Sequence, residues 1–440
     1  MGIGFGLCAN AAGRAARAVA DVLRPPLPIA VTAGVAAAYA WAVFAATFGY
    51  PGAIGIDYNA PGTDWMVFYG AVRALLHGNL PVIFDGDKFT AYLNSTFIGW
   101  LSKPLPFRPW LYPPTLLLFV APFAFLGFVA SYLTFQIMSG GLLIAALRYS
   151  LDRQHMAPAI AAAAVLAPAA ALNAVNGQLS FLVAALIVTG LHLLKTRPLI
   201  AGAVLGLASF KPQFCLLVPV ALVALRQWRA VLALVGSAVA LAVLSALIFG
   251  IDPWVSWASQ VAPGYVNPDA SGKWIEYGRI WGESVYACAL VLGASPWLAS
   301  GLQNLSIAIG AAATYAAFRS QLRPNEQLAV LLAATILAAP HSSANDELLL
   351  VIAGGLWLAA DGSAQTFRSW LVALALWVAP LFDPPAIARI TAVKPLFVAA
   401  FIALVFSRLN RKSPHCAPSV LAVLAPSNTA DRAHLKIDAT

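Results

Sequence analysis

The stretch AVLALVGSAVALAVLSALIFG, residues 230–250, decides the fold class of this chain. It contains no charged residue. At about 1.5 Å per residue, a helix of this length crosses the roughly 30 Å apolar core of a bilayer. The whole chain is 61% hydrophobic and only 10% charged, whereas a soluble domain carries roughly 25% charged residues. This composition leaves too little polar surface to cover a water-soluble core, and it predicts an all-α polytopic membrane protein.

Further apolar segments flank this stretch and predict a single transmembrane domain over residues 27–409, with about twelve to thirteen crossings. They lie at about 27–49, 113–129, 131–147, 157–174, 179–194, 199–225, 297–318, 327–340, 346–360, 369–381 and 393–407. Arg14, Arg17 and Arg24 precede the first segment, which is longer than the core of a cleavable signal peptide. We therefore expect an uncleaved first helix, with residues 1–26 and 410–440 in the cytoplasm.

The net charge of +9 does not predict nucleic-acid binding, because the basic residues lie in short clusters between apolar segments. Such clusters mark cytoplasmic loops in membrane proteins. We expect no nucleic-acid partner. The clusters are Arg148/Arg153, Lys195/Arg197, Arg226/Arg229, Arg319/Arg323, Arg368 and Arg408/Arg411/Lys412.

Two tracings of residues 113–225 remain open. If every basic cluster is cytoplasmic, 113–148 crosses an odd number of times and 199–225 is two short helices broken at Lys211-Pro212. Asn176–Gln178 and His341–Glu347 then lie outside. In the rival tracing, 113–148 is a two-helix hairpin, 199–225 is one long helix and Asn176–Gln178 lies inside. The positive-inside rule favours the first tracing and helix length favours the second.

Two longer loops, at about 50–112 and 251–296, are expected on the extracytoplasmic side in both tracings. The first loop is rich in Trp, Tyr and Phe, a composition that disfavours disorder. Within it, Asp64–Leu76 has the apolar spacing of a helix, with Thr63 or Asp64 at the N-cap position. We expect an amphipathic helix that lies at the membrane surface.

Polar residues near membrane depth are costly, so each is a functional hypothesis. Asp64 either caps its helix or acts as a catalytic base. Lys211 interrupts an apolar span beside Pro212; it either extends toward the interface or binds an anionic group where broken backbone lines a cavity. Two polar turns between apolar segments, Asn176–Gln178 and His341–Glu347, are further candidates, although the first fits an interhelical hydrogen bond equally well. Weaker candidates are Arg108, Tyr112, Glu276 and Arg279.

Motifs of soluble enzymes are missing from the chain. It has no phosphate-cradling glycine loop, no nucleophile-elbow serine and no paired-histidine zinc motif. The four cysteines are scattered without metal-ligand spacing, and Asp85-Gly86-Asp87 lacks the other ligands of a calcium loop and predicts a turn. We expect no cofactor and no metal. No internal repeat is visible, which disfavours secondary transporters.

Short motifs in a characteristic order resemble the family-87 glycosyltransferases, the polyprenyl-phosphate-mannose-dependent group with a GT-C fold. The resemblance covers roughly residues 30–410, and its late turn, His341-Ser342-Ser343-Ala344, departs from relatives in which this turn is richer in Tyr and Asp. The motifs are Asp64 through Tyr69, Leu76-His77-Gly78-Asn79-Leu80, Tyr112-Pro113-Pro114, Asn176-Gly177-Gln178, Gly202 with Gly206, Lys211-Pro212-Gln213, and Asn345-Asp346.

The resemblance implies a GT-C-type bundle and an inverting sugar transfer on the extracytoplasmic side, here the periplasmic face of a bacterial cytoplasmic membrane. The donor would be a polyprenyl-phosphate sugar, with mannose or another hexose, and the acceptor a lipid or a glycan. Asp64 matches the position of the general base. Residues expected to bind the donor phosphate or sugar are Lys211, Arg108, Tyr112, Asn176, Gln178, His341, Asn345 and Asp346.

Two other classes of function remain open. A transporter or a lipid-linked-sugar flippase without transferase activity would place charged residues along a path through the membrane and would have two pseudosymmetric halves. A non-catalytic membrane scaffold would need no polar cluster. A transferase instead requires Asp64 to lie near Lys211 and the late histidine-containing turn.

Overall fold

The computed structural model describes residues 26–48, 61–101, 103–151, 156–262, 272–360, 365–382 and 392–410. The predicted cytoplasmic ends, 1–26 and 410–440, fall almost wholly outside these ranges. Every regular element in the described ranges is helical, and none of them contains a strand. The all-α class is therefore confirmed.

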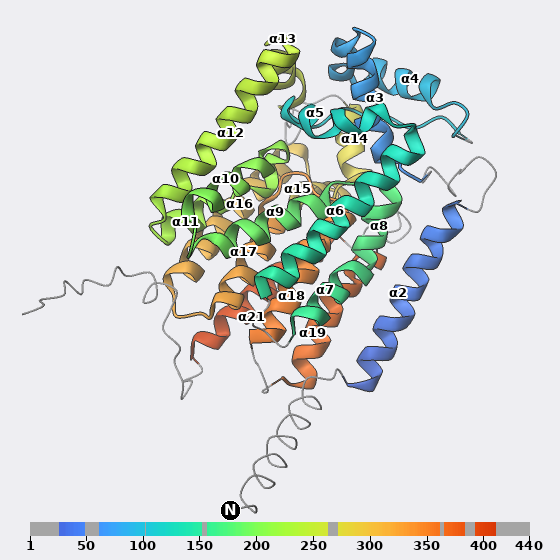
Figure 1. The fold of residues 1–440 in the computed structure, drawn as a ribbon. Coiled ribbons are helices and arrows are strands. Elements are labelled where there is room, and N and C mark those ends of the chain that lie inside the picture. Colours follow the sequence, from blue (N-terminus) through green and yellow to red (C-terminus); the bar gives the residue numbers. More distant parts are fainter. Residues whose placement is uncertain are drawn as a thin grey trace, which may run out of the picture.

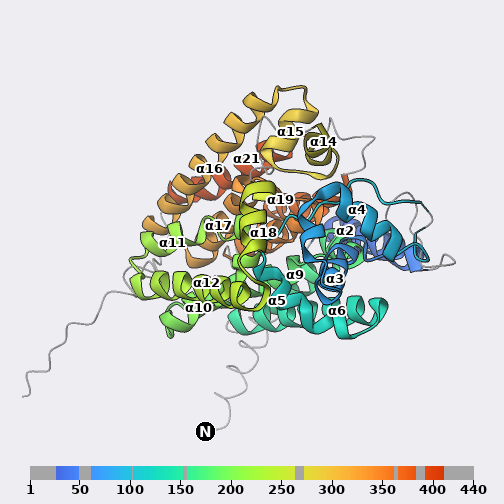
Figure 2. The same ribbon diagram turned by 90° about the horizontal axis from the view of Figure 1, so that it is seen from above.

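The helices run in one direction along the bundle and return, so that their connections gather at its two ends (Figures 1 and 2). In chain order they are α2 Leu27–Phe48, α3 Thr63–Leu76, η1 Leu80–Phe84, α4 Gly86–Thr96, α5 Thr115–Val120, η2 Ala121–Phe125, α6 Phe128–Leu151, α7 Ala157–Leu166, α8 Pro168–Asn176, α9 Ser180–Leu193, α10 Pro198–Leu207, η3 Ala208–Phe210, η4 Pro212–Phe214, α11 Val218–Ala224, α12 Trp228–Phe249, α13 Asp252–Ser256, η5 Trp257–Val261, α14 Gly272–Trp281, α15 Val285–Val291, α16 Pro296–Arg319, α17 Pro324–Ala338, η7 Ala344–Glu347, α18 Leu348–Ala360, α19 Phe367–Val378, η9 Ala379–Phe382, α21 Lys394–Phe406 and η11 Ser407–Asn410.

Three helices among the described residues are long and apolar enough to cross a membrane: Leu27–Ala46 of α2, α6 and α12. The pair α7 and α8, bent by 50°, is long and apolar enough to cross only when both helices are taken together as one broken span. Along α12 only Ala230 and Ser245 are buried, and such a large apolar surface is unfavourable in water but suits lipid. The remaining apolar helices are shorter, so the predicted twelve to thirteen crossings stay a prediction.

The path from 113 to 225 follows the tracing that the positive-inside rule favours. Residues 128–151 form one helix, α6, and the preceding α5 and η2 lie at the α3 end of the bundle (Figure 1). The single helix over 199–225 of the rival tracing does not form, because the chain breaks into η3 and η4 around Lys211. Gln178 donates a hydrogen bond to Asp64, so both residues lie at the same end.

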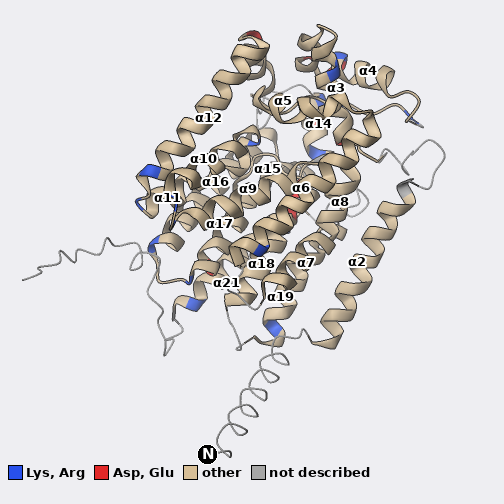
Figure 3. Cartoon of the chain, in the orientation of Figure 1, with Lys and Arg blue, Asp and Glu red and all other residues tan. Residues whose placement is uncertain are grey.

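Basic residues are distributed as this tracing requires. Figure 3 shows blue segments around α11, α18, α19 and α21, at the end of the bundle opposite α3 and α4, with further ones on α3 and α4 themselves. At the α3 end, Asp85 accepts a hydrogen bond from the Lys88 amide and so begins α4 as its N-cap. The predicted turn at Asp85-Gly86-Asp87 is thus the start of a helix.

Helix α3 begins within a residue of its predicted start and packs against other elements of the bundle. Its side chains are buried around most of its circumference, because α4, α5, η2 and α6 pack against it. Trp65 anchors it on α6: its Nε1 donates to Ser131 Oγ at 3.0 Å, and its ring stacks on Phe135 at 4.5 Å between centroids. The aromatic residues of this segment pack inside the protein, and its place at the membrane surface stays a prediction.

Helices α10 and α12 approach each other closely at two glycines. A Cβ on Gly202 would lie 2.1 Å from the carbonyl oxygen of Ala230, and one on Gly206 would lie 2.5 Å from that of Leu234. Backbone atoms cannot move aside as a flexible side chain does. The glycines therefore set the distance between these helices, as small residues do at membrane helix interfaces.

Gly202→Ala is expected to destabilise the protein by about 1–3 kcal/mol, because the added methyl group forces the two backbones apart. The matched control is Gly236→Ala on α12, where nothing lies within 4 Å of the new Cβ. There the better helix propensity of Ala stabilises by up to about 1 kcal/mol. Thermal unfolding in detergent measures both, and equal effects of the two substitutions would contradict the close packing.

Candidate functional site

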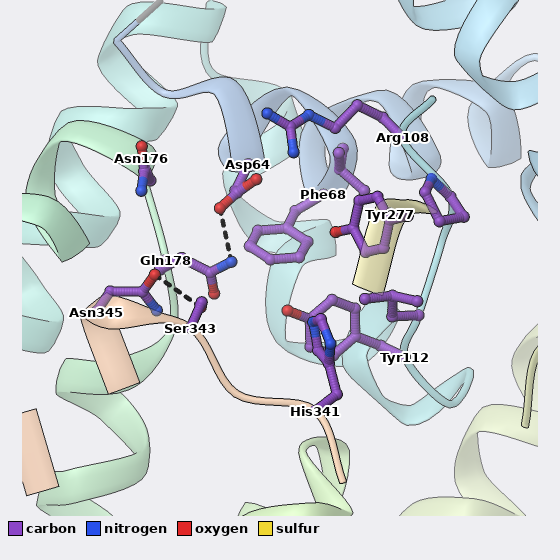
Figure 4. A pocket seen from close by; sticks show the side chains of 13 residues that line it. Asp64, Phe68, Arg108, Tyr112, Asn176, Gln178, Tyr277, His341, Ser343 and Asn345 are labelled. Carbon is purple, nitrogen blue, oxygen red and sulfur yellow. Dashed lines mark hydrogen bonds between the residues drawn. The ribbon is translucent and has the colours of Figure 1, made fainter. Parts of the chain in front are cut away.

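One cavity collects residues from five separate parts of the chain at the α3 end of the bundle (Figure 4). Its volume is about 70 Å³, and it is partly open to solvent. Its lining residues are Asp64, Val67, Phe68, Arg108, Pro109, Leu111, Tyr112, Asn176, Gln178, Tyr277, His341, Ser343 and Asn345. Seven of the nine residues predicted from the sequence are among these thirteen.

Asp64 stands in the first turn of α3 and faces this cavity. Gly62 occupies the N-cap position, and no side chain makes a capping hydrogen bond there. The Asp64 carboxylate instead accepts a hydrogen bond through Oδ2 from Gln178 Nε2, at 2.7 Å. The capping interpretation of Asp64 is therefore not supported, and its carboxylate is directed toward residues from elsewhere in the chain (Figure 4).

The turn Asn176–Gln178 is pressed against the start of α3. Gly177 has a φ of 76°, in the left-handed region that favours glycine, and ends α8. A Cβ at this position would lie 2.5 Å from the Cβ of Trp65. The Gly62 amide also donates to the Val175 carbonyl oxygen at 2.6 Å. Glycine thus lets the turn approach closely enough for Gln178 to reach Asp64.

Arg108, Tyr277 and His341 also line the cavity (Figure 4). Arg108 is 5% exposed and lies close enough to Tyr277 to act on the pKa of its hydroxyl. The Tyr277 ring stacks on His341, with 6.0 Å between centroids and 23° between planes. Burial raises the pKa of Tyr277 to about 12, although Arg108 acts in the other direction. Its hydroxyl is therefore protonated at neutral pH and is available as a donor.

His341 is neutral under ordinary conditions. Burial lowers its pKa to about 4, partly offset by the nearby Asp346 carboxylate. Between this value and its ordinary value near 6.5, the unfolded chain binds a proton that the folded chain does not bind. This side chain therefore lowers the stability of the folded state as the pH falls from about 6.5 to about 4.

We expect His341→Gln to flatten the loss of stability between pH 6.5 and pH 4. The full pKa shift corresponds to about 3 kcal/mol, and solvent in the cavity reduces this figure. The measurement is the thermal unfolding midpoint of wild type and variant across this pH range. An unchanged pH slope in the variant would show that other groups cause the acid sensitivity.

Lys211 and Asp346 do not line the cavity but form a buried ion pair behind it. The Lys211 Nζ lies 2.6 Å from Asp346 Oδ1, and the two residues are 2% and 3% exposed. Ser180 Oγ donates to the same oxygen at 2.7 Å, while the Ser343 amide donates to Oδ2 at 3.1 Å. The pair therefore joins three turns, 176–180, 208–214 and 341–347.

This ion pair is connected to residues that line the cavity. Asn345 Nδ2 donates to Ser180 Oγ at 3.2 Å, and Ser343 Oγ donates to Asn345 Oδ1 at 2.9 Å. Both Ser343 and Asn345 line the cavity. The role of Lys211 and Asp346 as direct ligands of a donor stays a prediction, and in the structure the pair is connected by hydrogen bonds to residues that line the cavity.

Tyr277 is the main cavity residue that the sequence analysis missed. The candidates predicted in the second loop were Glu276 and Arg279, which form an ion pair on the exposed face of α14. The two Arg279 nitrogens donate to the Glu276 carboxylate oxygens at 2.5 Å and 2.7 Å. Tyr277, between them, points to the other face and into the cavity (Figure 4). Helical periodicity places Tyr277 on a different face of α14 from Glu276 and Arg279. It does not indicate which face contacts the first loop, about 170 residues earlier in the chain.

The cavity brings together one carboxylate, one guanidinium and several aromatic rings (Figure 4). Phe68 and Tyr112 supply edge-to-face packed rings, 5.2 Å between centroids. Among the described residues, no group of three or more His, Cys, Asp or Glu side chains is placed to hold a metal ion. A carboxylate that accepts a proton, a cation that binds an anion and rings that pack against a sugar suit group transfer between hydroxyl and phosphate oxygens.

Comparison with known proteins gave one result. A sequence model of glycosyltransferase family 87 matches residues 110–340, more than half of the chain. Tyr112, Gln178 and Tyr277 lie within the matched residues, whereas Asp64 and Arg108 precede them. No curated protein and no solved structure matches the chain.

Proposed function

Because this chain belongs to glycosyltransferase family 87, we propose that it transfers a sugar from a polyprenyl phosphate to a lipid or glycan acceptor. The transferred sugar is mannose or another hexose. The protein is a GT-C-type bundle of about twelve to thirteen membrane helices in the bacterial cytoplasmic membrane. Its cavity faces the periplasm, opposite the end where basic clusters gather.

The observation that carries this proposal is that Asp64 and Arg108 line the same cavity. Asp64 accepts the proton of the acceptor hydroxyl as that oxygen attacks the anomeric carbon of the sugar. The bond between this carbon and the phosphate oxygen breaks, and its electron pair leaves with the phosphate. Attack from the face opposite the leaving group inverts the configuration at the anomeric carbon.

The leaving phosphate gains negative charge and needs a preorganised partner. Arg108 offers a guanidinium, which binds phosphate oxygens through paired hydrogen bonds, and the Tyr277 hydroxyl stands beside it. Neutral His341 adds no charge of its own. These three residues form the phosphate side of the cavity, while Asp64 forms the acceptor side.

A donor carried on a membrane lipid fits the rest of the chain. It needs no nucleotide-binding motif and no nucleotide-bound metal, and its polyprenyl tail finds apolar surface along the helices next to the cavity. Phe68 and Tyr112 offer ring faces to the sugar, with Asn176 and Asn345 as amide partners for its hydroxyls. The ligands of the protein are then the lipid-linked sugar, a lipid or glycan acceptor and the surrounding membrane lipids.

The test is sugar transfer by the purified full-length protein in detergent or nanodiscs. Synthetic polyprenyl-phosphate mannose labelled in the sugar is supplied with a panel of lipid and glycan acceptors, and nucleotide-linked mannose serves as the comparison donor. We expect product only from the polyprenyl-phosphate donor, with inverted anomeric configuration by NMR. Transfer from the nucleotide sugar alone would contradict the proposed donor class.

The alternative function is movement of the lipid-linked sugar across the membrane without transfer. The same purified protein distinguishes this function from sugar transfer. Protein reconstituted into vesicles is loaded with the labelled donor on one leaflet. Appearance of intact donor on the other leaflet, with no transfer to any acceptor, would establish a flippase and overturn the transferase proposal.

A further inference from the structure

A chain of side-chain hydrogen bonds leads from the Asp64 carboxylate into the membrane helices. Gln178 Nε2 donates to Asp64 Oδ2 at 2.7 Å. The backbone carbonyl oxygen of Gln178 accepts from Gln136 Nε2 at 3.0 Å. Gln136 Oε1 accepts in turn from Asn173 Nδ2 at 2.9 Å. Three amide side chains from α6, α8 and the turn after α8 are thus connected to one carboxylate.

The inner part of this chain is fully enclosed. Gln136 is 8% exposed and Asn173 is 0% exposed. The Asn173 side chain also accepts from the Ser180 amide at 2.9 Å, and the backbone carbonyl oxygen of Asn173 accepts from the amides of Gly177 and Gln178 at 3.0 Å each. Buried amides are costly unless they are hydrogen-bonded. Here each bond contributes to fixing the backbone of the turn that carries Gln178.

A fixed Gln178 determines how the Asp64 carboxylate is presented. One oxygen, Oδ2, is held by the Gln178 amide, and the carboxylate faces the cavity from that fixed position (Figure 4). Amides do not titrate, so Gln178 orients the carboxylate without adding a charge of its own. Small displacements of a catalytic group lower rates strongly, by about 10²-fold for 1 Å.

We propose that Gln178, held by the buried Gln136–Asn173 pair, is the residue that positions the Asp64 carboxylate for proton abstraction. This inference rests on the proposed transferase function. Gln178 therefore acts on the base and not on the donor, which is a different role from the sugar or phosphate contact expected from the sequence. Gln136 and Asn173 act through Gln178 and are positioning residues as well.

Other titratable groups share the cavity with Asp64. Arg108 comes from the segment before α5, Tyr277 from α14, and Tyr112 and His341 from two further segments. Asp346 lies behind the cavity wall in its ion pair with Lys211. None of these residues is altered in the variants below, so a change in pH dependence reports on the contact between residue 178 and Asp64.

The first variant is Gln178→Glu, which keeps the shape of the side chain but sets a second carboxylate at the distance of a hydrogen bond from Asp64. Two such carboxylates share a proton and titrate as a pair, and one pKa of the pair rises. We expect the acid limb of the pH profile of kcat/KM to move upward by about one pH unit or more. A merely structural role of residue 178 would lower activity without moving this limb.

The second variant is Gln136→Leu, which removes the hydrogen bonds to Gln178 and Asn173 without adding charge. We expect kcat to fall by about 10–100-fold, with KM for the donor within about threefold. The matched control is Gln303→Leu, which removes a buried glutamine that bonds to Tyr286, Ser306 and Ala338 on α15 to α17, away from the cavity. Thermal unfolding of all variants identifies any loss of activity caused by loss of the fold.

A readout without turnover separates this inference from the proposed function. A carbodiimide modifies protonated carboxyl groups, and mass spectrometry of the peptide containing Asp64 gives the pH midpoint of its modification. We expect a higher midpoint in Gln178→Glu than in wild type, whether or not sugar is transferred. An unchanged midpoint, or wild-type kcat in a folded Gln136→Leu variant, would overturn the positioning role. Absence of transfer in wild type with a raised midpoint would overturn only the proposed function.

Discussion

Asp64→Asn is expected to lower kcat for sugar transfer by about 10³-fold, within the 10²–10⁴-fold range of a positioned general base. Asparagine keeps the size of the side chain but cannot accept the proton of the acceptor hydroxyl. KM for the polyprenyl-phosphate donor should stay within about threefold, because the phosphate side of the cavity is unchanged. Initial rates at several donor and acceptor concentrations measure both constants.

The control for this substitution is Asp252→Asn. Asp252 is an exposed acid in the first turn of α13, on the second loop, and does not line the cavity. It tests whether loss of any carboxylate on this face lowers activity. Wild-type kcat in a folded Asp64→Asn variant would remove the general-base assignment, since an amide has no means of taking the proton.

Lys211→Met is expected to destabilise the protein by about 3–5 kcal/mol, because it leaves the buried Asp346 carboxylate without its counter-charge. Asp346 is 3% exposed and also holds Ser180 and Ser343. Loss of the pair therefore disturbs the cavity wall together with the fold. Thermal unfolding in detergent at neutral pH measures the change.

Two controls show whether this effect comes from an uncompensated buried charge. In Lys211→Met with Asp346→Leu, both charges are gone, and we expect part of the lost stability to return, as for other buried pairs replaced by apolar residues. In Lys88→Met, an exposed pair with Asp85 is broken, and the unfolding midpoint should hardly change. Equal unfolding midpoints for Lys211→Met and Lys88→Met would show that burial does not strengthen the Lys211–Asp346 pair.

The sequence predicted those parts of the fold that depend on local patterns. The segments 131–147 and 230–250 are long and uniformly apolar, and they correspond to α6 and α12. The break at Lys211-Pro212 was one of two open alternatives, because a proline and a lysine weaken a helix but do not end it in every setting. The deciding fact, that Gln178 bonds to Asp64, joins residues 114 positions apart.

Candidate site residues could be predicted where their chemistry was unusual for a membrane segment. Asp64, Gln178 and His341 are polar residues beside apolar runs, and all three line the cavity. Tyr277 was missed because a tyrosine in a polar loop gives no local signal of function. Its role depends on the contact between its loop and the first loop, which the sequence does not show. The roles of Lys211 and Asp346 were also beyond local patterns, since a buried ion pair depends on which distant segments meet.

The Lys211–Asp346 pair has a consequence for how the protein is made. Its members are 135 residues apart in sequence, so the ribosome adds Lys211 long before Asp346. During synthesis the lysine has no partner acid, and η3 and η4 hold it in a segment flanked by apolar helices. The charge is neutralised only when α17 has been inserted and η7 follows it. Completion of the wall around Asn345 is therefore a late event of biogenesis, and a chain cut short before Asp346 would keep an uncompensated cation where the finished enzyme has none.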